Sequence, residues 1–153
     1  MTHDMRTEPR RKKPSLHEEA QVNIVRTGNL VADALECVLK PHGITATQYN
    51  VLRILRGCGS EGLCRNEVRD QLLSRMPDAT RLLDRMEKAG LVARSREGAD
   101  RRTVTTRITD TGRRLVERLE VIVEEEQLRQ LGHLSEKQTR KLIKLLTLVR
   151  NDD

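Results

Sequence analysis

Three charged side chains lie next to one another in one short stretch of this sequence. Residues 98–112, GADRRTVTTRITDTG, place Asp100, Arg101 and Arg102 in a turn that precedes a segment rich in threonine and valine. A charged turn between two short strands is narrow enough to enter the minor groove of DNA, where a guanidinium meets concentrated negative potential. The alternative is a surface ion-pair cluster, which contributes little to stability.

A second group of polar residues lies in the segment MPDATRLLDRMEKAG, where the spacing of the apolar residues predicts an amphipathic helix. Its inward face is predicted to consist of Ala79, Leu82, Leu83 and Met86, and its outward face of Asp78, Thr80, Arg81, Asp84, Arg85 and Lys88. For Asp84 we expect an ion pair within the helix, with Arg81, Arg85 or Lys88. The first turns of such a helix reach base edges in the major groove.

The outward residues of this helix have defined partners on duplex DNA. Asp78 can accept a hydrogen bond from cytosine N4, Thr80 can contact a thymine methyl group or a phosphate, and Arg81 can pair with guanine. The alternative for Asp78 is an acidic residue stabilised by the helix N-terminus. The residues predicted to contact DNA are Arg75, Asp78, Thr80, Arg81, Arg85, Arg96, Asp100, Arg101 and Arg102, with Arg75 and Arg85 on phosphates.

One cysteine could carry a signal. Cys64 lies at the predicted start of a short helix, with Arg65 adjacent and Glu67 in the capping-box position. The helix N-terminus and Arg65 favour a thiolate, whereas Glu67 opposes it. Oxidation or soft-metal binding there would disturb the DNA-binding unit, with Cys58 as a resolving partner. The alternative is an inert residue in place of a hydroxyl cap, and Cys37 is expected to be a small core residue.

Catalysis and metal binding have no comparable support. The four histidines are scattered, no glycine-rich phosphate loop follows a strand, and no Ser/His/Asp or paired-carboxylate arrangement can be placed. The three cysteines lack zinc spacing and fit a reduced compartment. The sequence also lacks an apolar run that could span a bilayer and an N-terminal signal peptide. We therefore expect a cytoplasmic protein that is not an enzyme and has no cofactor, no metal and no membrane partner.

Composition narrows the kind of nucleic acid that could be bound. The chain has 153 residues, 34% of them charged, and a formal net charge of +6, which attracts a polyanion. The basic excess lies in residues 62–114 and 1–14. Tyr49 is the only aromatic residue, which excludes surfaces that bind single strands by stacking bases on aromatic rings. Binding through the shape, grooves and phosphates of a duplex remains possible.

The helices and strands that carry these residues are predicted from the periodicity of the apolar residues. Apolar spacing predicts helices in residues 15–40, in TATQYNVLRILRG, in CRNEVRDQLL and in MPDATRLLDRMEKAG. LVARSRE and TVTTRIT then predict a two-stranded hairpin, and two further helices follow in residues 110–131 and 135–149. The expected fold is mostly α with a small β wing, a winged helix-turn-helix domain flanked by long helices.

With this order of helices and hairpin, the sequence resembles the MarR family of bacterial transcriptional regulators. The family pattern D-x-R-x-x-x-V-x-L-T-x-x-G is matched by Asp100, Arg102, Ile108, Thr109 and Gly112, with Thr106 where valine is usual. RLLDRMEKAGLVARS also resembles the family's recognition helix and first wing strand, and the similarity covers residues 16–149. Two features depart from the family: Cys64 replaces a Ser or Thr helix cap, and the aromatic residues that line many ligand pockets are missing, which argues against a phenolic ligand.

The resemblance implies a homodimeric regulator of a pseudo-palindromic duplex, which we expect to be a repressor relieved by an unknown small-molecule effector or a thiol-directed signal. It also implies that Arg102 enters the minor groove, with Asp100 orienting the wing and Arg101 near phosphate. A competing hypothesis is a module that binds protein, because fold alone does not fix function. Such a scaffold would not need the basic stretch of residues 65–114.

The domain organisation follows from the same assignment. Residues 1–14 are predicted to be a flexible basic arm, which is either solvated or touches phosphate. Residues 15–45 and 110–150 form the dimerisation region, and residues 46–109 form the DNA-binding domain. The apolar stripes predicted to make the dimer are Ile24, Val31, Leu35 and Val38, then Leu115, Leu119 and Ile122, then Leu142, Leu145, Leu146 and Val149.

Overall fold

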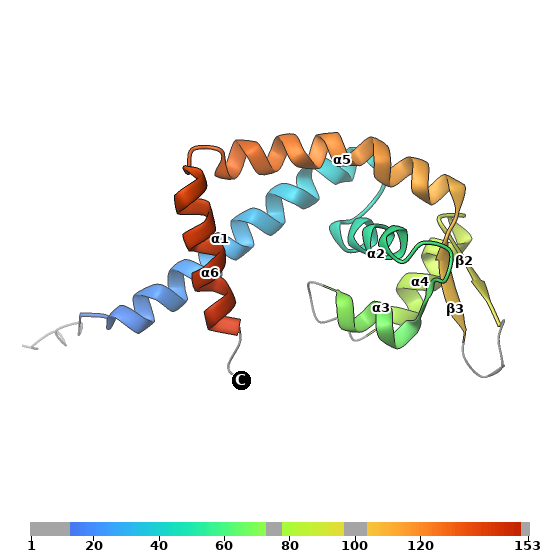
Figure 1. Cartoon of the computed structure of the whole chain (residues 1–153), viewed down its shortest axis with the longest axis horizontal. Helices are drawn as coiled ribbons and strands as arrows, with labels where there is room; N and C mark the ends of the chain where they lie inside the picture. The colour runs from blue at the N-terminus through green and yellow to red at the C-terminus, as the bar shows by residue number, and fades with distance from the viewer. Residues whose placement is uncertain (1–12, 73–77, 97–103, 151–153) are drawn as a thin grey trace, which may run out of the picture.

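The computed structural model describes residues 13–72, 78–96 and 104–150, and it shows a mainly helical protein with one small sheet (Figure 1). The elements in chain order are α1 (Leu16–Leu39), η1 (Lys40–His42), α2 (Ala46–Gly57), β1 (Leu63–Cys64), α3 (Arg65–Gln71), α4 (Ala79–Lys88), β2 (Val92–Ser95), β3 (Thr105–Ile108), α5 (Asp110–Leu131) and α6 (Glu136–Arg150). This confirms the predicted fold class. In the part of the chain that the structure describes, no helix could cross a membrane.

The sheet has three antiparallel strands in the order β1-β3-β2, where the sequence predicted only the β2-β3 hairpin. Val92 pairs with Ile108, and on the other edge of β3 Leu63 pairs with Thr106. Two residues are too few to show the alternation of a strand, which is why β1 escaped prediction. Gly62 makes this pairing possible, because its φ is 73° and an added Cβ would lie 2.6 Å from the carbonyl oxygen of Thr106.

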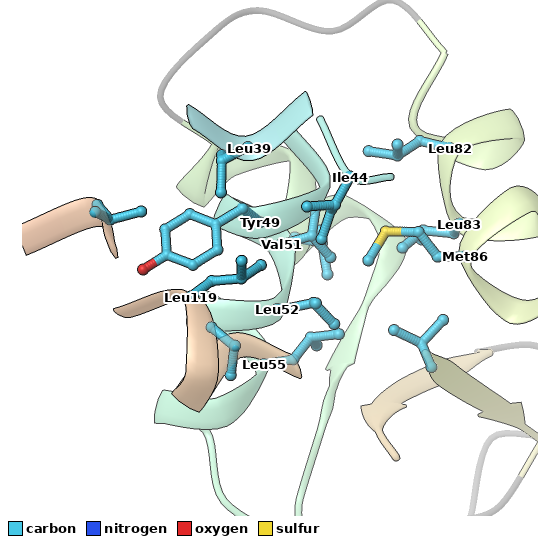
Figure 2. Packing of buried hydrophobic residues seen from close by; sticks show 14 residues of the cluster. Leu39, Ile44, Tyr49, Val51, Leu52, Leu55, Leu82, Leu83, Met86 and Leu119 are labelled. Carbon is cyan, nitrogen blue, oxygen red and sulfur yellow. The ribbon is translucent and has the colours of Figure 1, made fainter. Parts of the chain in front are cut away.

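The core lies between α2, α4, the sheet, the middle of α5 and the end of α1. Its buried hydrophobic residues are Leu39, Ile44, Tyr49, Val51, Leu52, Leu55, Val68, Leu82, Leu83, Met86, Val92, Val116, Leu119 and Val123. Figure 2 shows the ring of Tyr49, the only aromatic side chain, close to Leu39 and Leu119. The prediction that Ala79, Leu82, Leu83 and Met86 face inward is confirmed, because each is buried.

Side chains at the helix starts fix the elements of this unit. Thr45 and Gln48 form a reciprocal capping box at the start of α2, with hydrogen bonds of 3.0 and 3.2 Å. Thr109 accepts a hydrogen bond of 3.0 Å from the backbone N–H of Gly112 at the start of α5 and donates one of 2.7 Å to the carbonyl of Gly90. Thr109 therefore links the start of α5 to the turn that follows α4.

The two outer helices have little cover from their own chain. Within the described ranges, α6 has no buried residue and α1 has only Leu39. Figure 1 shows α6 and the N-terminal part of α1 extending away from the part that holds α2, α3, α4 and the sheet. Cys37 is exposed on α1, so the prediction that it is a core residue is wrong for the single chain. Val22, Ile24, Val25, Leu30 and Val31 of α1 are exposed as well, so α5 and α2 leave much of the apolar surface of α1 uncovered.

The prediction for the dimer stripe on α5 needs correction. Leu119 is only 1% exposed and belongs to the core of its own chain, and Leu115 and Ile122 pack against that core. α5 uses this face to cover α1 and α2, so Leu119 is not available to a partner, whereas Leu115 and Ile122 stay partly exposed. Leu35 and Val38 on α1 are likewise partly buried against the same core.

Candidate nucleic-acid interface

Helix α4 follows directly after Asp78, whose carboxylate serves as its N-cap. One oxygen accepts a hydrogen bond of 3.1 Å from the backbone N–H of Arg81, and the other lies 3.0 Å from Nε of the Arg81 side chain. A carboxylate here satisfies a free N–H group of the first turn and is favoured by the helix dipole. Of the two interpretations offered for Asp78, this geometry is that of the helix cap.

The outer face of α4 presents one hydroxyl and a row of cations. Thr80, Arg81, Arg85 and Lys88 are exposed, and the side chain of Arg81 is 84% exposed. The Thr80 hydroxyl accepts a hydrogen bond of 3.2 Å from Nη1 of Arg65, which lies at the start of α3. Sequence reasoning had not assigned Arg65 to this face. The residues predicted on α4 thus share one surface, opposite the buried side of the helix.

Asp84 does not follow the prediction, because its partner lies outside α4. Its Oδ1 is 2.5 Å from Nη2 of Arg94 on strand β2. The same guanidinium donates to Glu87 Oε2, with Nη2 at 2.6 Å and Nε at 2.9 Å. These hydrogen bonds from Arg94 lower the pKa of the Glu87 carboxyl below its ordinary value. Sequence analysis missed Glu87 and Arg94, since helical spacing identifies only partners in the same helix.

The base of the wing is tied to the loop before β1. Arg107 on β3 donates from Nε to the carbonyl of Ser60 at 2.9 Å and from Nη1 to the Ser95 hydroxyl at 2.7 Å. Arg96 follows β2 and is exposed. Arg75, Asp100, Arg101 and Arg102, all predicted to contact DNA, lie outside the described residues.

Cys64 caps α3 and lines a cavity beside α4. Its backbone N–H donates to Glu67 Oε2 at 2.7 Å, which lowers the pKa of the Glu67 carboxyl. This keeps a negative charge close to the half-buried thiol. The cavity, of about 390 Å³, is lined by Cys64, Arg65, Asn66, Thr80, Leu83, Arg94, Val104 and Thr106. The Cys58 thiol donates to the Ile54 carbonyl at 3.2 Å.

The arrangement suits binding rather than catalysis. A buried apolar side holds α4 on the core, and the opposite side carries exposed cations next to a small sheet. In the described ranges no group of three or more metal-binding side chains is brought together. Exposed guanidinium and ammonium groups on one helix face can neutralise phosphates and donate to base edges.

Comparison with known proteins gives one family. The model described as transcriptional regulator SarA/Rot matches residues 34–119, more than half of the chain. The crystal structure of a MarR transcription factor from Planctomyces limnophilus is 36% identical and has a TM-score of 0.68, and the match covers 90% of this chain and 99% of that one.

Two further relatives are more distant. The Staphylococcus aureus MepR–DNA complex has a TM-score of 0.77 at 22% identity, with 92% of this chain and 100% of that chain covered, so it shows the shared fold. The transcriptional repressor IacR of Pseudomonas putida is 27% identical over 115 residues, which cover 75% of this chain and 68% of that protein.

Proposed function

Since the chain belongs to the MarR family of winged-helix transcriptional regulators, which the SarA/Rot match also supports, we propose that it is a homodimeric repressor. It is a transcriptional regulator and not an enzyme. In this proposal it acts in the cytoplasm, where the two winged helices of the dimer engage a pseudo-palindromic duplex through neighbouring turns of the major groove.

The observation that carries the proposal is the two-sided character of α4. Ala79, Leu82, Leu83 and Met86 hold one side in the core, while Thr80, Arg81 and Arg85 stay exposed on the other. A helix held in this way presents fixed donors to a groove without losing its own packing. MepR, which shares the fold, has been solved bound to DNA, and this supports DNA binding by the present chain. Base contacts by Thr80 and Arg81, phosphate contacts by Arg85 and Arg96, and minor-groove contacts by the wing complete the proposed surface.

A second copy of the chain is the proposed cover for α1 and α6. Their exposed large apolar side chains include Val22, Ile24, Val25, Leu30, Val31, Leu142, Ile143, Leu145, Leu148 and Val149. α1 has four acidic residues against one arginine, whereas α6 has five lysines and arginines against one glutamate. Both helices have exposed apolar side chains, and their net charges are opposite. This favours packing of α6 from one copy against α1 of the other.

Repression and its relief complete the proposal. The repressor IacR is a relative over most of its length, which supports a repressor here. Two kinds of signal remain open: a small effector, and oxidation or metal binding at Cys64. Cys64 lies between α3 and the cavity beside α4, so a change there would act inside the DNA-binding unit.

The test combines duplex selection with sedimentation. The full chain selects duplexes from a random-sequence pool, and the affinity for the selected duplex is compared with that for a scrambled duplex of equal length. We expect a palindromic selected sequence and specific binding at least a thousandfold tighter than non-specific binding. Sedimentation at micromolar concentration should give a dimer. Equal affinity for both duplexes would contradict sequence-specific regulation, and a monomer would contradict the assembly.

A further inference from the structure

Arg94 connects the recognition helix to the first wing strand. Its guanidinium contacts Asp84 at 2.5 Å and Glu87 at 2.6 and 2.9 Å, so one side chain of β2 holds two carboxylates of α4. The backbone N–H of Arg94 also donates to Glu87 Oε1 at 3.2 Å. Bidentate and charge-assisted hydrogen bonds of this kind fix direction as well as distance. We call these three residues the Arg94 clamp.

We propose that Arg94 is a positioning residue that acts through Asp84 and Glu87 to fix the orientation of α4 relative to the wing. This rests on the proposed function, because orientation matters only if both elements meet one duplex. In a dimer on DNA, the helix and the wing must reach the major and minor grooves together, so their relative angle enters the affinity for the correct site.

The turn between α4 and β2 explains why a clamp is needed. α4 ends at Lys88, and Gly90 follows with a φ of 71°, a left-handed conformation that makes the chain reverse. Leu91 donates to the carbonyl of Met86 at 2.9 Å, which holds the turn itself. Beyond this turn the chain enters β2, and the Arg94 clamp adds a second connection between the two elements. The hydrogen bond within the turn and the Arg94 clamp beyond it together fix the angle between α4 and β2, which the turn alone does not fix.

The exposure and the ion pairs of Arg94 favour a positioning role over a phosphate contact. Its side chain is 24% exposed, against 84% for Arg81, and its Nε and Nη2 already donate to the carboxylates of Glu87 and Asp84. Asp84 and Glu87 place negative charge on a helix that is to approach phosphates, which opposes binding. Their presence is accounted for when Arg94 neutralises them and uses them as anchors.

The sharpest test removes negative charge and expects weaker specific binding. Glu87→Gln and Asp84→Asn each make the chain more positive, so electrostatics alone predicts tighter binding to any duplex. If the Arg94 clamp positions α4, the non-specific affinity of both variants is kept or rises. Their affinity for the duplex selected by the parent falls about tenfold, which is the cost of one mismatched base pair. Arg94→Gln should lower specific affinity similarly and leave the salt slope unchanged. Arg94→Lys, with a single point charge in place of the planar fork, should restore only part of it.

Asp70→Asn is the matched control. Asp70 lies on α3 and pairs only with its neighbour Arg69 at 3.3 Å among the described contacts, and both are more than half exposed. It carries the same change of charge but leaves the Arg94 clamp intact, so its ratio of specific to non-specific affinity should equal that of the parent. Thermal unfolding of every variant shows whether the fold is kept; partial unfolding would lower both affinities together, whereas the clamp predicts a change in their ratio.

Three results would overturn the proposal. The first is that Glu87→Gln and Arg94→Gln keep the parental ratio of specific to non-specific affinity. The second is that Arg94→Gln lowers the salt slope by about one, as loss of a phosphate contact does. The third is that Asp70→Asn lowers the ratio as much as Glu87→Gln does. If the parent itself does not distinguish the selected from the scrambled duplex, the proposed function fails instead. Loss of the clamp and loss of the function are therefore separate outcomes.

Discussion

The guanidinium of Arg56 on α2 holds the carboxylate of Glu120 on α5 through two hydrogen bonds of 2.9 and 2.7 Å. This bridge joins a helix of the winged-helix unit to the long helix that leads away to α6. Both side chains are partly exposed, so the bridge contributes modestly to stability. It lies beside the buried Tyr49, whose pKa is raised by burial; the Glu120 carboxylate adds to this rise, whereas the guanidinium of Arg56 opposes it.

The bridge predicts a pH dependence of stability. Hydrogen bonds from Arg56 lower the pKa of Glu120 in the folded chain. A carboxyl whose folded pKa is depressed stabilises the fold above its unfolded pKa of about 4.3, and this contribution is lost as pH falls through the folded pKa. Glu120→Gln should therefore lower the thermal midpoint slightly at pH 7 and not at all once the parental carboxyl is protonated. An equal difference at pH 7 and at a pH low enough to protonate the parental carboxyl would show that the ion pair is not its cause.

Gly62 gives a prediction about β1. Gly62→Ala adds a Cβ that would lie 2.6 Å from the Thr106 carbonyl oxygen, in addition to the cost of a φ of 73°. Gly59→Ala is the matched control, since its φ is 65° and no described atom lies within 4 Å of its added Cβ. We expect a loss of roughly 1 kcal/mol at Gly59 and at least about 2 to 3 kcal/mol at Gly62 in denaturant unfolding. Equal losses would mean that β1 does not need this close approach.

The sequence predicts features that depend on residues close together in the chain better than contacts between elements that are far apart in it. The buried face of α4 follows from helical period and is found where predicted, with Leu82 and Met86 inside. Contacts between elements are different: Asp84 meets Arg94 only because the turn at Gly90 folds β2 back beside α4, and no local pattern encodes that. Helical period also identifies an apolar stripe such as that of Leu119 without showing which surface covers it, the same chain or a second copy.

Two residues of α4 should affect DNA binding in different ways. Arg85→Ala removes a cation predicted to meet phosphate, so the salt dependence of binding should fall by about one unit of slope. Thr80→Ala removes an uncharged group and its hydrogen bond from Arg65, so specific affinity should fall while the slope stays nearly the same. Affinity titrations of the selected duplex over a range of salt concentrations measure both. Parental binding by both variants at every salt concentration would show that α4 is not the contact surface.

The last prediction concerns Cys64 as a point of signal input. Its thiol lies at the N-cap of α3, half-buried, and lines the cavity that also reaches Thr80 on α4. Oxidation to a sulfenic acid or a disulfide adds bulk and polarity where α3 meets the recognition helix, and the Glu67 carboxylate beside it opposes further negative charge. We expect mild peroxide to weaken binding of the parent to its selected duplex about tenfold or more, and a thiol reductant to restore it.

The variants decide which cysteine is responsible. Cys37 is exposed in the single chain and is the control cysteine: Cys37→Ser should still lose affinity on oxidation if Cys64 is the sensor. Cys64→Ser should bind the duplex equally before and after peroxide, since serine can also cap α3. Cys58→Ser tests the resolving partner: the oxidised parent should contain a 58–64 disulfide that mass spectrometry detects as a crosslink, and Cys58→Ser should not form it. Full affinity of the oxidised parent would exclude the thiol switch and leave a small-molecule effector as the signal.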